Sequence, residues 1–385
     1  MSASAPQAPA GTALSTPLSV APMMDVTDRH FRFVLRGVTA KTLLYTEMIT
    51  AQAAVRGDTD KLLARSPDEG AVVLQLGGDS PELLAAAAEL GAAFGYSELN
   101  LNVGCPSPRV KSGNFGACLM ADPGLVGRCV RAMAEASGLP VGVKHRIGID
   151  DWDSYADMLA FVDGVQDASG GAVSRFVVHA RKAWLSGLSP KENRTIPPLN
   201  HQLVHRLKAE RQWLRVETNG GVRDLVTAAS HLRHVDGVML GRAVWDDPLV
   251  LVAADALVAE PGGEIREPGR AERLAAGVAA VRRALPYAAE EVAMGTPLPA
   301  VTRHLVPLFA GLPGAKAWRR QLTEGARAVG ASPAAALRLL TDALDRVIEA
   351  ADRSAPEPGA GFEPPQQAPG DDQMLDLVGA LADPG

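Results

Sequence analysis

A single thiol stands in a loop that is suited to present it for chemistry. Cys105 lies in the run Asn102-Val103-Gly104-Cys105-Pro106, directly after a short apolar segment. Glycine and proline favour a sharp turn, and a thiol with an ordinary pKa of about 8.5 is mostly protonated at neutral pH and can give up a proton. The alternative is that Cys105 is a small buried apolar side chain, as most free cysteines are.

Two glycine-containing turns later in the chain are typical of phosphate binding. Asn219-Gly220-Gly221 and Gly241-Arg242 each follow an apolar run. Glycine lets backbone N–H groups approach an anion closely, and Arg242 can add a bidentate contact. The alternative is that both are ordinary turns between a strand and a helix.

Lys144 and His179 end two further apolar runs. A lysine is costly to bury unless an anion lies beside it, such as a phosphate or the N1/O2 edge of a reduced flavin. His179, taken alone, is interpreted as a core histidine whose hydrogen bonds are satisfied.

Short apolar runs of the kind typical of buried strands carry these side chains. The runs are Leu18–Met23, Leu43–Glu47, Val72–Leu76, Glu98–Asn102, Val141–His145, Phe176–His179, Leu214–Thr218 and Gly237–Leu240. Helical patterns separate them at 81–94, 124–137, 154–166, 201–211 and 224–232. Eight strands alternating with helices predict a (β/α)8 TIM barrel, in which the strand ends meet at one mouth. An open doubly wound sheet is the alternative, but no glycine fingerprint for dinucleotides follows the first strand.

Beyond Pro248 the chain changes character. Alanine, leucine and arginine dominate, and helical patterns lie at 272–285, 299–309, 315–329 and 333–351. We expect a disordered arm at 1–16, a catalytic barrel at 17–250, a small helical bundle at 251–353 and a disordered acidic tail at 354–385.

The net charge of −6 lacks the basic footprint typical of a nucleic-acid binder. The charge is uneven, however, because residues 354–385 hold six carboxylates and no Lys or Arg, whereas residues 299–328 hold five Lys or Arg against Glu324. Three cysteines without a CxxC pair indicate a reducing compartment, and no run approaches the length of a membrane span. We therefore expect a cytoplasmic protein that binds neither a membrane nor a metal.

Several motifs, in order along the chain, resemble those of the tRNA-dihydrouridine synthases over residues 17–345. They are Ala21-Pro22-Met23 with Val26-Thr27-Asp28, Gln75-Leu76-Gly77-Gly78, Asn100–Ser107 with Gly113–Ala117, Val143–Gly148, Val178–Arg181 and Asn219-Gly220-Gly221. The long run 179–194, from His179 to Arg194, is similar to the A subgroup of that family.

The resemblance implies an FMN-bound barrel with a helical RNA-binding domain. It implies reduction of the C5–C6 bond of uridine at positions 20 and 20a of the tRNA D-loop, with hydride derived from NADPH. Cys105 would donate the proton. The cofactor contacts that it implies are Pro22, Met23, Met24, Gln75, Lys144, His179, Asn219, Gly220, Gly221, Gly241 and Arg242. The tRNA contacts that it implies are Asn102, for the target uracil, and Arg181, Glu192, Thr195, Arg303, Arg319 and Arg320, with His304, Lys316 and Arg327 as further candidates.

Two other functions stay open on the residues alone. One is an FMN oxidoreductase of dihydroorotate or enoate type that acts on a small molecule, although it gives no reason for a basic helical appendage. The other is a non-catalytic tRNA-binding protein, which Cys105, Lys144 and Gln75 disfavour. We expect a monomer in each case.

Overall fold

The computed structural model describes residues 14–107, 113–261, 263 and 265–354. The predicted arm at 1–13, the predicted tail at 355–385 and the loop segment 108–112 lie outside the described residues. Among the described residues, no helix is long and apolar enough to cross a membrane.

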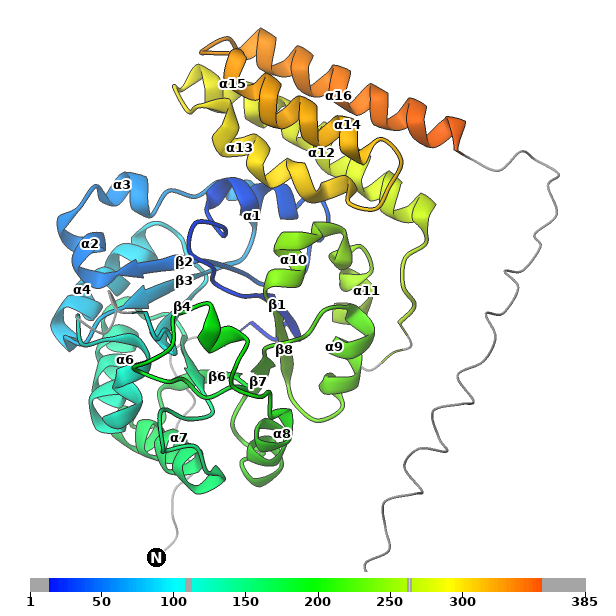
Figure 1. Cartoon of the computed structure of the whole chain (residues 1–385). Coiled ribbons are helices and arrows are strands. Elements are labelled where there is room, and N and C mark those ends of the chain that lie inside the picture. The colour runs from blue at the N-terminus through cyan, green and yellow to red at the C-terminus, as the bar shows by residue number, and fades with distance from the viewer. Residues whose placement is uncertain (1–13, 108–112, 262, 264, 355–385) are drawn as a thin grey trace, which may run out of the picture.

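Eight parallel strands form the barrel that the sequence predicts (Figure 1). They are β1 (Leu18–Val20), β2 (Leu44–Thr50), β3 (Val72–Gly77), β4 (Glu98–Val103), β5 (Val141–Arg146), β6 (Val173–His179), β7 (Val216–Asn219) and β8 (Gly237–Leu240). Each strand pairs with its neighbour in the chain, β1 pairs with β8, and a bridge between Ser19 and Leu43 links β1 to β2. The sheet therefore closes on itself rather than remaining open.

Helices cover the outside of the barrel. They are α1 (Arg29–Leu35), α2 (Ala51–Arg56), α3 (Thr59–Leu62), η1 (Pro67–Glu69), α4 (Pro81–Ala93), η2 (Gly116–Ala121), α6 (Pro123–Ser137), α7 (Tyr155–Ser169), η3 (Glu192–Arg194), α8 (His201–Glu210), α9 (Leu225–Leu232), α10 (Arg242–Asp246), η4 (Pro248–Leu251) and α11 (Ala254–Ala259). The predicted starts follow from capping residues, since Ser80, Asp122 and Asp224 accept hydrogen bonds from the first turns of α4, α6 and α9.

The amino-terminal end of the barrel is closed by buried charges. Arg175 donates to Glu98 and Glu217 over 2.7 and 2.6 Å, and all three side chains are buried. The same guanidinium donates to the carbonyl of Leu14 at 2.9 Å. Residues 14–16, which belong to the arm predicted to be disordered, therefore have defined contacts. The polar residues at the carboxyl ends of the strands lie at the opposite end of the barrel.

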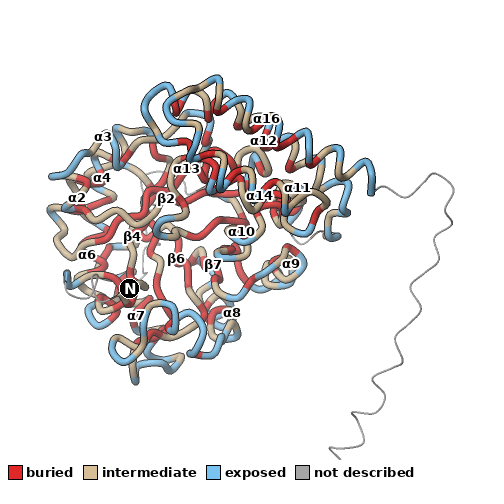
Figure 2. The backbone as a smooth tube through the Cα atoms, turned by 45° about the horizontal axis from the view of Figure 1, so that its top comes forward, coloured by how far each residue is buried: buried red, intermediate tan, exposed pale blue. Residues whose placement is uncertain are grey.

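A second group of helices follows the barrel. It consists of α12 (Arg270–Ala293), α13 (Leu298–Leu305), η5 (Val306–Phe309), α14 (Ala315–Arg320), η6 (Gln321–Gly325, a π-turn), α15 (Ala326–Ala328) and α16 (Pro333–Arg353). Buried Phe309, Trp318 and Leu340 belong to a second apolar core, which also includes Phe33 and Val34 of α1. Figure 2 shows buried stretches along the strands and along the inner sides of these helices. The predicted end of α12 at Leu285 is wrong, because the helix continues past Pro286, which is exposed.

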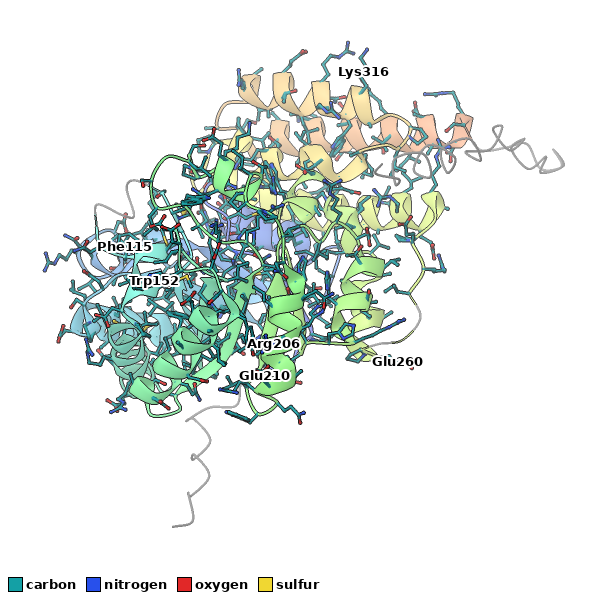
Figure 3. All side chains as sticks on the ribbon, turned by 60° about the horizontal axis from the view of Figure 1, so that its bottom comes forward. Phe115, Trp152, Arg206, Glu210, Glu260 and Lys316 are labelled. Carbon is teal, nitrogen blue, oxygen red and sulfur yellow. The ribbon has the colours of Figure 1, made fainter. Side chains whose placement is uncertain are left out.

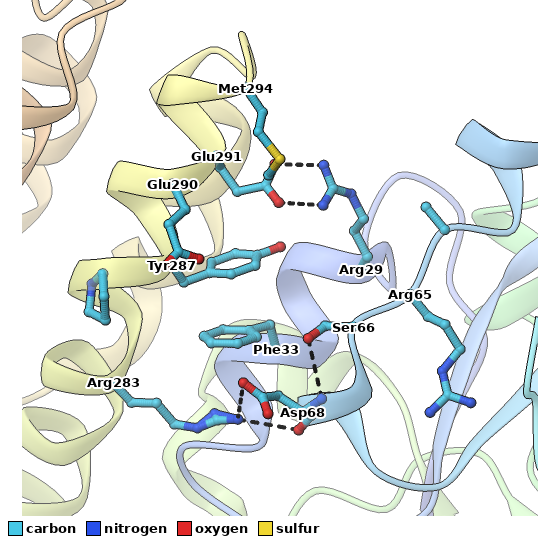
Figure 4. A pocket seen from close by; sticks show the side chains of 12 residues that line it. Arg29, Phe33, Arg65, Ser66, Asp68, Arg283, Tyr287, Glu290, Glu291 and Met294 are labelled. Carbon is cyan, nitrogen blue, oxygen red and sulfur yellow. Dashed lines mark hydrogen bonds and ion pairs between the residues drawn. The ribbon is translucent and has the colours of Figure 1, made fainter.

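Contacts between α1 and α12 join the two parts. Phe33 and Tyr287 stack with ring centroids 3.8 Å apart, and Arg29 forms an ion pair with Glu291. An open cleft of about 710 Å³ lies beside this contact, between the barrel flank and α12 (Figure 4). The charges that line it are largely paired with one another, as Arg283 is with Asp68.

Candidate active site

The predicted polar residues meet at the carboxyl ends of neighbouring strands. Gln75 on β3 is in register with Asn100 on β4, and Asn102 on β4 with Lys144 on β5. Further round, His179 on β6 is in register with Asn219 on β7. Since side chains two residues apart in a strand share a face, these residues all point into one mouth.

A ladder of side-chain amides runs across β3 and β4. The Asn102 Oδ1 accepts hydrogen bonds from the backbone N–H groups of Gly104 and Cys105 over 3.1 and 3.0 Å. Its Nδ2 therefore donates to Gln75 Oε1 at 2.8 Å, and Gln75 Nε2 donates to Asn100 Oδ1 at 2.8 Å. Because backbone N–H groups only donate, they fix the orientation of the whole ladder. One hydrogen on Asn102 and one on Gln75 remain for a ligand.

Cys105 is half-buried in a loop that is held from two sides. Its carbonyl accepts a hydrogen bond from Ala117 N at 2.9 Å. On the other side, Arg146 donates to the carbonyl of Gly104 at 2.8 Å, and to the carbonyls of Lys182 and Asn193 over 3.0 and 2.9 Å. These contacts fix the backbone that carries Cys105 directly after the carboxyl end of β4.

Sequence reasoning gave Arg146 no role, yet this residue joins the loop of Cys105 to two segments that follow β6. The signal that was available is strand alternation, which places Arg146 on the same face as Lys144. Nothing local in the sequence shows that Asn193, some fourteen residues beyond β6, returns to meet it.

Lys144 lies inside the mouth and donates from Nζ to Asn219 Oδ1 at 3.0 Å. Asn219 in turn donates to the carbonyl of Met239 at 2.7 Å. Burial, assisted by the positive charge of Arg146, lowers the pKa of Lys144 to about 7. Lys144 pairs with no carboxylate among the described residues, so a negatively charged ligand is the partner that its position favours.

More unpaired cations surround this lysine. Burial lowers the pKa values of Arg181 and Arg194, and the nearby charge of Arg242 lowers both further. The pKa of His179 is lowered well below its ordinary range by burial and by these positive charges, so its imidazole is neutral. In the described part of the chain, none of the three arginines forms an ion pair with an acid. The mouth therefore carries positive charge that no described carboxylate neutralises.

The glycines of the turn after β7 are required by close packing. Gly220 has a φ of +111°, and a Cβ there would lie 2.6 Å from the ring of His179. Gly221 has a φ of +70°, and a Cβ there would lie 2.4 Å from Leu199. Gly241 begins α10, and the Arg242 guanidinium reaches the carbonyl of Arg194 at 3.3 Å. A turn free of Cβ atoms beside unpaired arginines fits a phosphate, while the amides of Gln75 and Asn102 fit the carbonyl edge of a heteroaromatic ring.

The loop after β1 contributes the remaining predicted cofactor residues. Pro22 and Met23 are half-buried at the mouth, whereas the Met24 side chain is 55% exposed. Met23 N donates to Thr27 Oγ1 at 3.0 Å, which holds the loop against the start of α1.

The residues predicted to contact the substrate fall into two places. Arg181 donates to the carbonyl of Pro197, Glu192 accepts from Ser189 N at 2.8 Å, and Thr195 donates to the carbonyl of Lys191 at 3.3 Å, so all three help to fold the segment after β6. The second place is the helical part of the chain. There Arg303 forms an ion pair with Asp28, His304 is buried against the same carboxylate, and Lys316, Arg319, Arg320 and Arg327 are exposed.

Comparisons with known proteins agree with this geometry. The family model described as dihydrouridine synthase (Dus) matches residues 19–347. A Synechocystis protein named tRNA-dihydrouridine(20/20a) synthase is 53% identical over 317 residues, which are 82% of this chain and 91% of that protein. Proteins of the same name from Salmonella typhi and Escherichia coli K12 are each 48% identical, covering 84% and 86% of this chain and 95% and 91% of their own lengths.

Proposed function

The chain belongs to the dihydrouridine synthase family, and from this premise we propose that it reduces uridine to 5,6-dihydrouridine at positions 20 and 20a of the tRNA D-loop. The relatives bear that activity in their names. The observation that carries the proposal is the convergence of the Cys105 thiol, the amide ladder and an unpaired cationic cluster at one mouth.

We propose FMN as the bound cofactor. Gln75 would donate to the ring, Lys144 would lie at its pyrimidine edge with His179 beside it, and Pro22, Met23 and Met24 would cover it. The phosphate would lie against Asn219, Gly220, Gly221, Gly241 and Arg242. When bound, the reduced flavin supplies the hydride for uracil C6, and NADPH is the proposed source of its electrons.

The chain's own residues would then complete the reduction. Addition at C6 leaves C5 in need of a proton, and the Cys105 S–H bond breaks as the C5–H bond forms, so that a thiolate remains and later takes a proton from water. Lys144 and the free hydrogen on Asn102 Nδ2 would stabilise the charge that develops on uracil O4.

The tRNA must deliver its uridine out of the base stack to reach this mouth. We propose that Arg181, Glu192 and Thr195 line the entrance and that Arg303, Arg319 and Arg320 contact the backbone from the helical part of the chain. We also propose that the barrel predicted at 17–250, which α11 extends to residue 259, forms the catalytic domain, and that the helices from α12 onward in the predicted segment 251–353 form the tRNA-binding domain, in a monomer that acts in the cytoplasm.

Purified protein tests the proposal directly. We expect a yellow protein that, with NADPH and an unmodified tRNA transcript, forms dihydrouridine measurable by nucleoside mass spectrometry. Cys105→Ala should keep its flavin and lose about 100-fold or more in rate, because general acid catalysis contributes roughly that much. A colourless protein that takes up no FMN would contradict the proposal, and full activity of Cys105→Ala would contradict the proton-donor role.

A further inference from the structure

Several large apolar side chains are exposed around the cationic mouth. Trp152 and Ile196 have exposed fractions of 56% and 58%, and Met24 and Leu199 of 55% and 36%. They lie on the connections that follow β1, β5 and β6. A single exposed apolar residue is ordinary, but apolar side chains gathered beside unpaired cations match the chemistry of a nucleic acid, which offers both ring faces and phosphates.

Trp152 stands on a tight turn that fixes its position. Ile149 and Trp152 exchange both backbone hydrogen bonds, at 2.9 and 2.8 Å. Asp150 between them has a φ of +45°, and its carboxylate accepts a hydrogen bond from Leu185 N at 2.8 Å. A Cβ on Gly148 would lie 2.1 Å from the Trp152 carbonyl, so only glycine fits there. The Trp152 side chain is therefore exposed, while these contacts fix the backbone that carries it.

This turn extends the mouth beyond the ends of β5 and β6. Ala183, four residues after β6, donates to the carbonyl of Gly148 at 2.9 Å, and Asp150 N donates back to Ala183 at 2.8 Å. Lys182 forms an ion pair with Asp153 at 2.6 Å and lies 4.2 Å from the centre of the Trp184 ring. Figure 3 shows Trp152 on the same flank of the barrel as Phe115, which precedes η2 near the Cys105 loop.

We infer that Trp152 is a stacking platform for a nucleobase of the RNA substrate that neighbours the uridine in the mouth. The inference rests on the proposed function. A flipped uridine leaves its neighbour without a stacking partner on one side, and an indole replaces that partner for any base. Arg181 lies two residues before Ala183, which pairs with the turn of Trp152, and the charge of Arg242 acts on both Arg181 and Arg194, so these cations are available to the flanking phosphates. The substrate segment is accordingly an unpaired loop rather than a duplex, because paired bases cannot present a face to Trp152.

The chain offers a matched control. Trp213 is 69% exposed and lies between α8 and β7, at the amino end of β7 and therefore at the opposite end of the barrel. The probe is an unmodified tRNA transcript, and its Kd is measured against full-length Trp152→Ala, Trp152→Phe and Trp213→Ala at several salt concentrations.

We expect Trp152→Ala to weaken binding about tenfold, since one stacked base contributes roughly that factor. Trp152→Phe should stay within about threefold of the wild type and Trp213→Ala should be unchanged. The slope of log Kd against log salt should be the same for Trp152→Ala as for the wild type, because no cation is removed. Wild-type affinity in Trp152→Ala, or an equal loss in Trp213→Ala, would overturn the inference.

A second measurement uses the wild type itself, in case Trp152→Ala does not fold. A transcript with 2-aminopurine beside the target uridine should lose fluorescence on binding as its base stacks on the indole, and unchanged fluorescence would overturn the inference. Dihydrouridine formation on the unlabelled transcript separates the two hypotheses. If the wild type forms dihydrouridine and Trp152→Ala keeps the wild-type affinity for RNA, only the inference about Trp152 is contradicted. If the wild type forms no dihydrouridine but its RNA binding depends on Trp152, only the proposed function is contradicted.

Discussion

Asn102 forms hydrogen bonds with three residues before any ligand arrives. Its oxygen holds the backbone of Gly104 and Cys105, and its nitrogen holds Gln75. An amide nitrogen carries two hydrogens, so one remains for a uracil carbonyl. The residue proposed to contact the substrate thus also positions the loop of Cys105, the proposed proton donor.

Two substitutions separate these roles. Asn102→Asp keeps the oxygen that holds the loop but removes the donor, whereas Asn102→Ala removes both. We expect both variants to lose dihydrouridine formation about 100-fold, but only Asn102→Ala to expose Cys105 to faster alkylation by iodoacetamide, measured by peptide mass spectrometry. Equal alkylation rates in the two variants would show that Oδ1 does not restrain the loop.

The proposed contact of Lys144 with FMN should make FMN binding dependent on pH. Its pKa is lowered to about 7 by burial and by Arg146, so its ammonium loses the proton as pH rises through 7. A bound FMN would place a hydrogen-bond acceptor beside the Lys144 ammonium and would favour its charged form. We therefore expect the FMN affinity of the apoprotein to fall about tenfold between pH 7 and pH 9. Fluorescence titration of FMN measures this. Lys144→Met should bind weakly with no such trend, and a pH-independent wild type would rule out the contact.

Position at a strand end was enough to find Cys105, Lys144 and Gln75 from the sequence. Arg146 and Arg194 were not predicted from the sequence, because they act through contacts between loops that are far apart in the chain. The segment after β6 folds through hydrogen bonds to its own carbonyls, and no hydrophobic periodicity in the sequence predicts such a conformation.

At the scale of elements, all eight strands were predictable because parallel strands buried on both faces appear as continuous apolar runs. The short helix α1 was not predicted, since it has only seven residues and buries the polar His30 and Arg32 together with its apolar side chains, which leaves no clear amphipathic pattern. Its position depends on tertiary contacts with α12 and α13. Likewise, α11 was assigned to the helical part of the chain, yet Ala254 and Leu257 lie in the core of the barrel.

Asp28 joins these elements and provides a test. It caps α1 by accepting from Phe31 N at 2.9 Å, and it binds Arg303 and His304 of α13. Asp28→Asn keeps a capping oxygen but loses the charge and should lower the free energy of unfolding by about 2 kcal/mol. Asp28→Ala also loses the cap and should lower it by about 1 kcal/mol more. Urea denaturation at pH 7 measures both, and equal stability of all three proteins would contradict the contact.

The same contact has a defined pH dependence. Burial alone would raise the pKa of Asp28, but the hydrogen bond and charge of His304 and hydrogen bonds from Phe31 and Arg303 hold it well below its ordinary value. A lowered pKa means that the stabilisation is fully present above about pH 4 and is lost as the pH falls below it. The advantage of the wild type over Asp28→Asn should therefore shrink by about 1 kcal/mol between pH 7 and pH 3.

At the scale of the whole molecule, the net charge of −6 conceals where the cations lie. Six carboxylates belong to residues 354–385, of which only Ser354 is described, while unpaired arginines surround the mouth and the exposed cations Lys316, Arg319 and Arg320 lie on α14. The net charge of the whole chain therefore says little about whether it binds a nucleic acid.

Replacing Arg319 and Arg320 together by alanine tests the helical contribution. We expect weaker tRNA binding and a salt dependence reduced by about two phosphate contacts, with flavin content unchanged. A control of equal charge is Arg206→Ala with Arg233→Ala, because Arg206 lies on α8 and Arg233 caps the carboxyl end of α9, in the barrel rather than in the helical part of the chain. Filter binding over a range of salt concentrations measures the slopes, and unaltered affinity in the first pair would remove α14 from the interface.

We propose that this chain converts uridines 20 and 20a of tRNA to dihydrouridine with Cys105 as proton donor. Mapping dihydrouridine by mass spectrometry, in tRNA from cells that lack the protein, tests it most directly. The modification should be absent at both positions, return with the wild-type chain and stay absent with Cys105→Ala. Unchanged dihydrouridine at both positions in the deletion cells would contradict the claim.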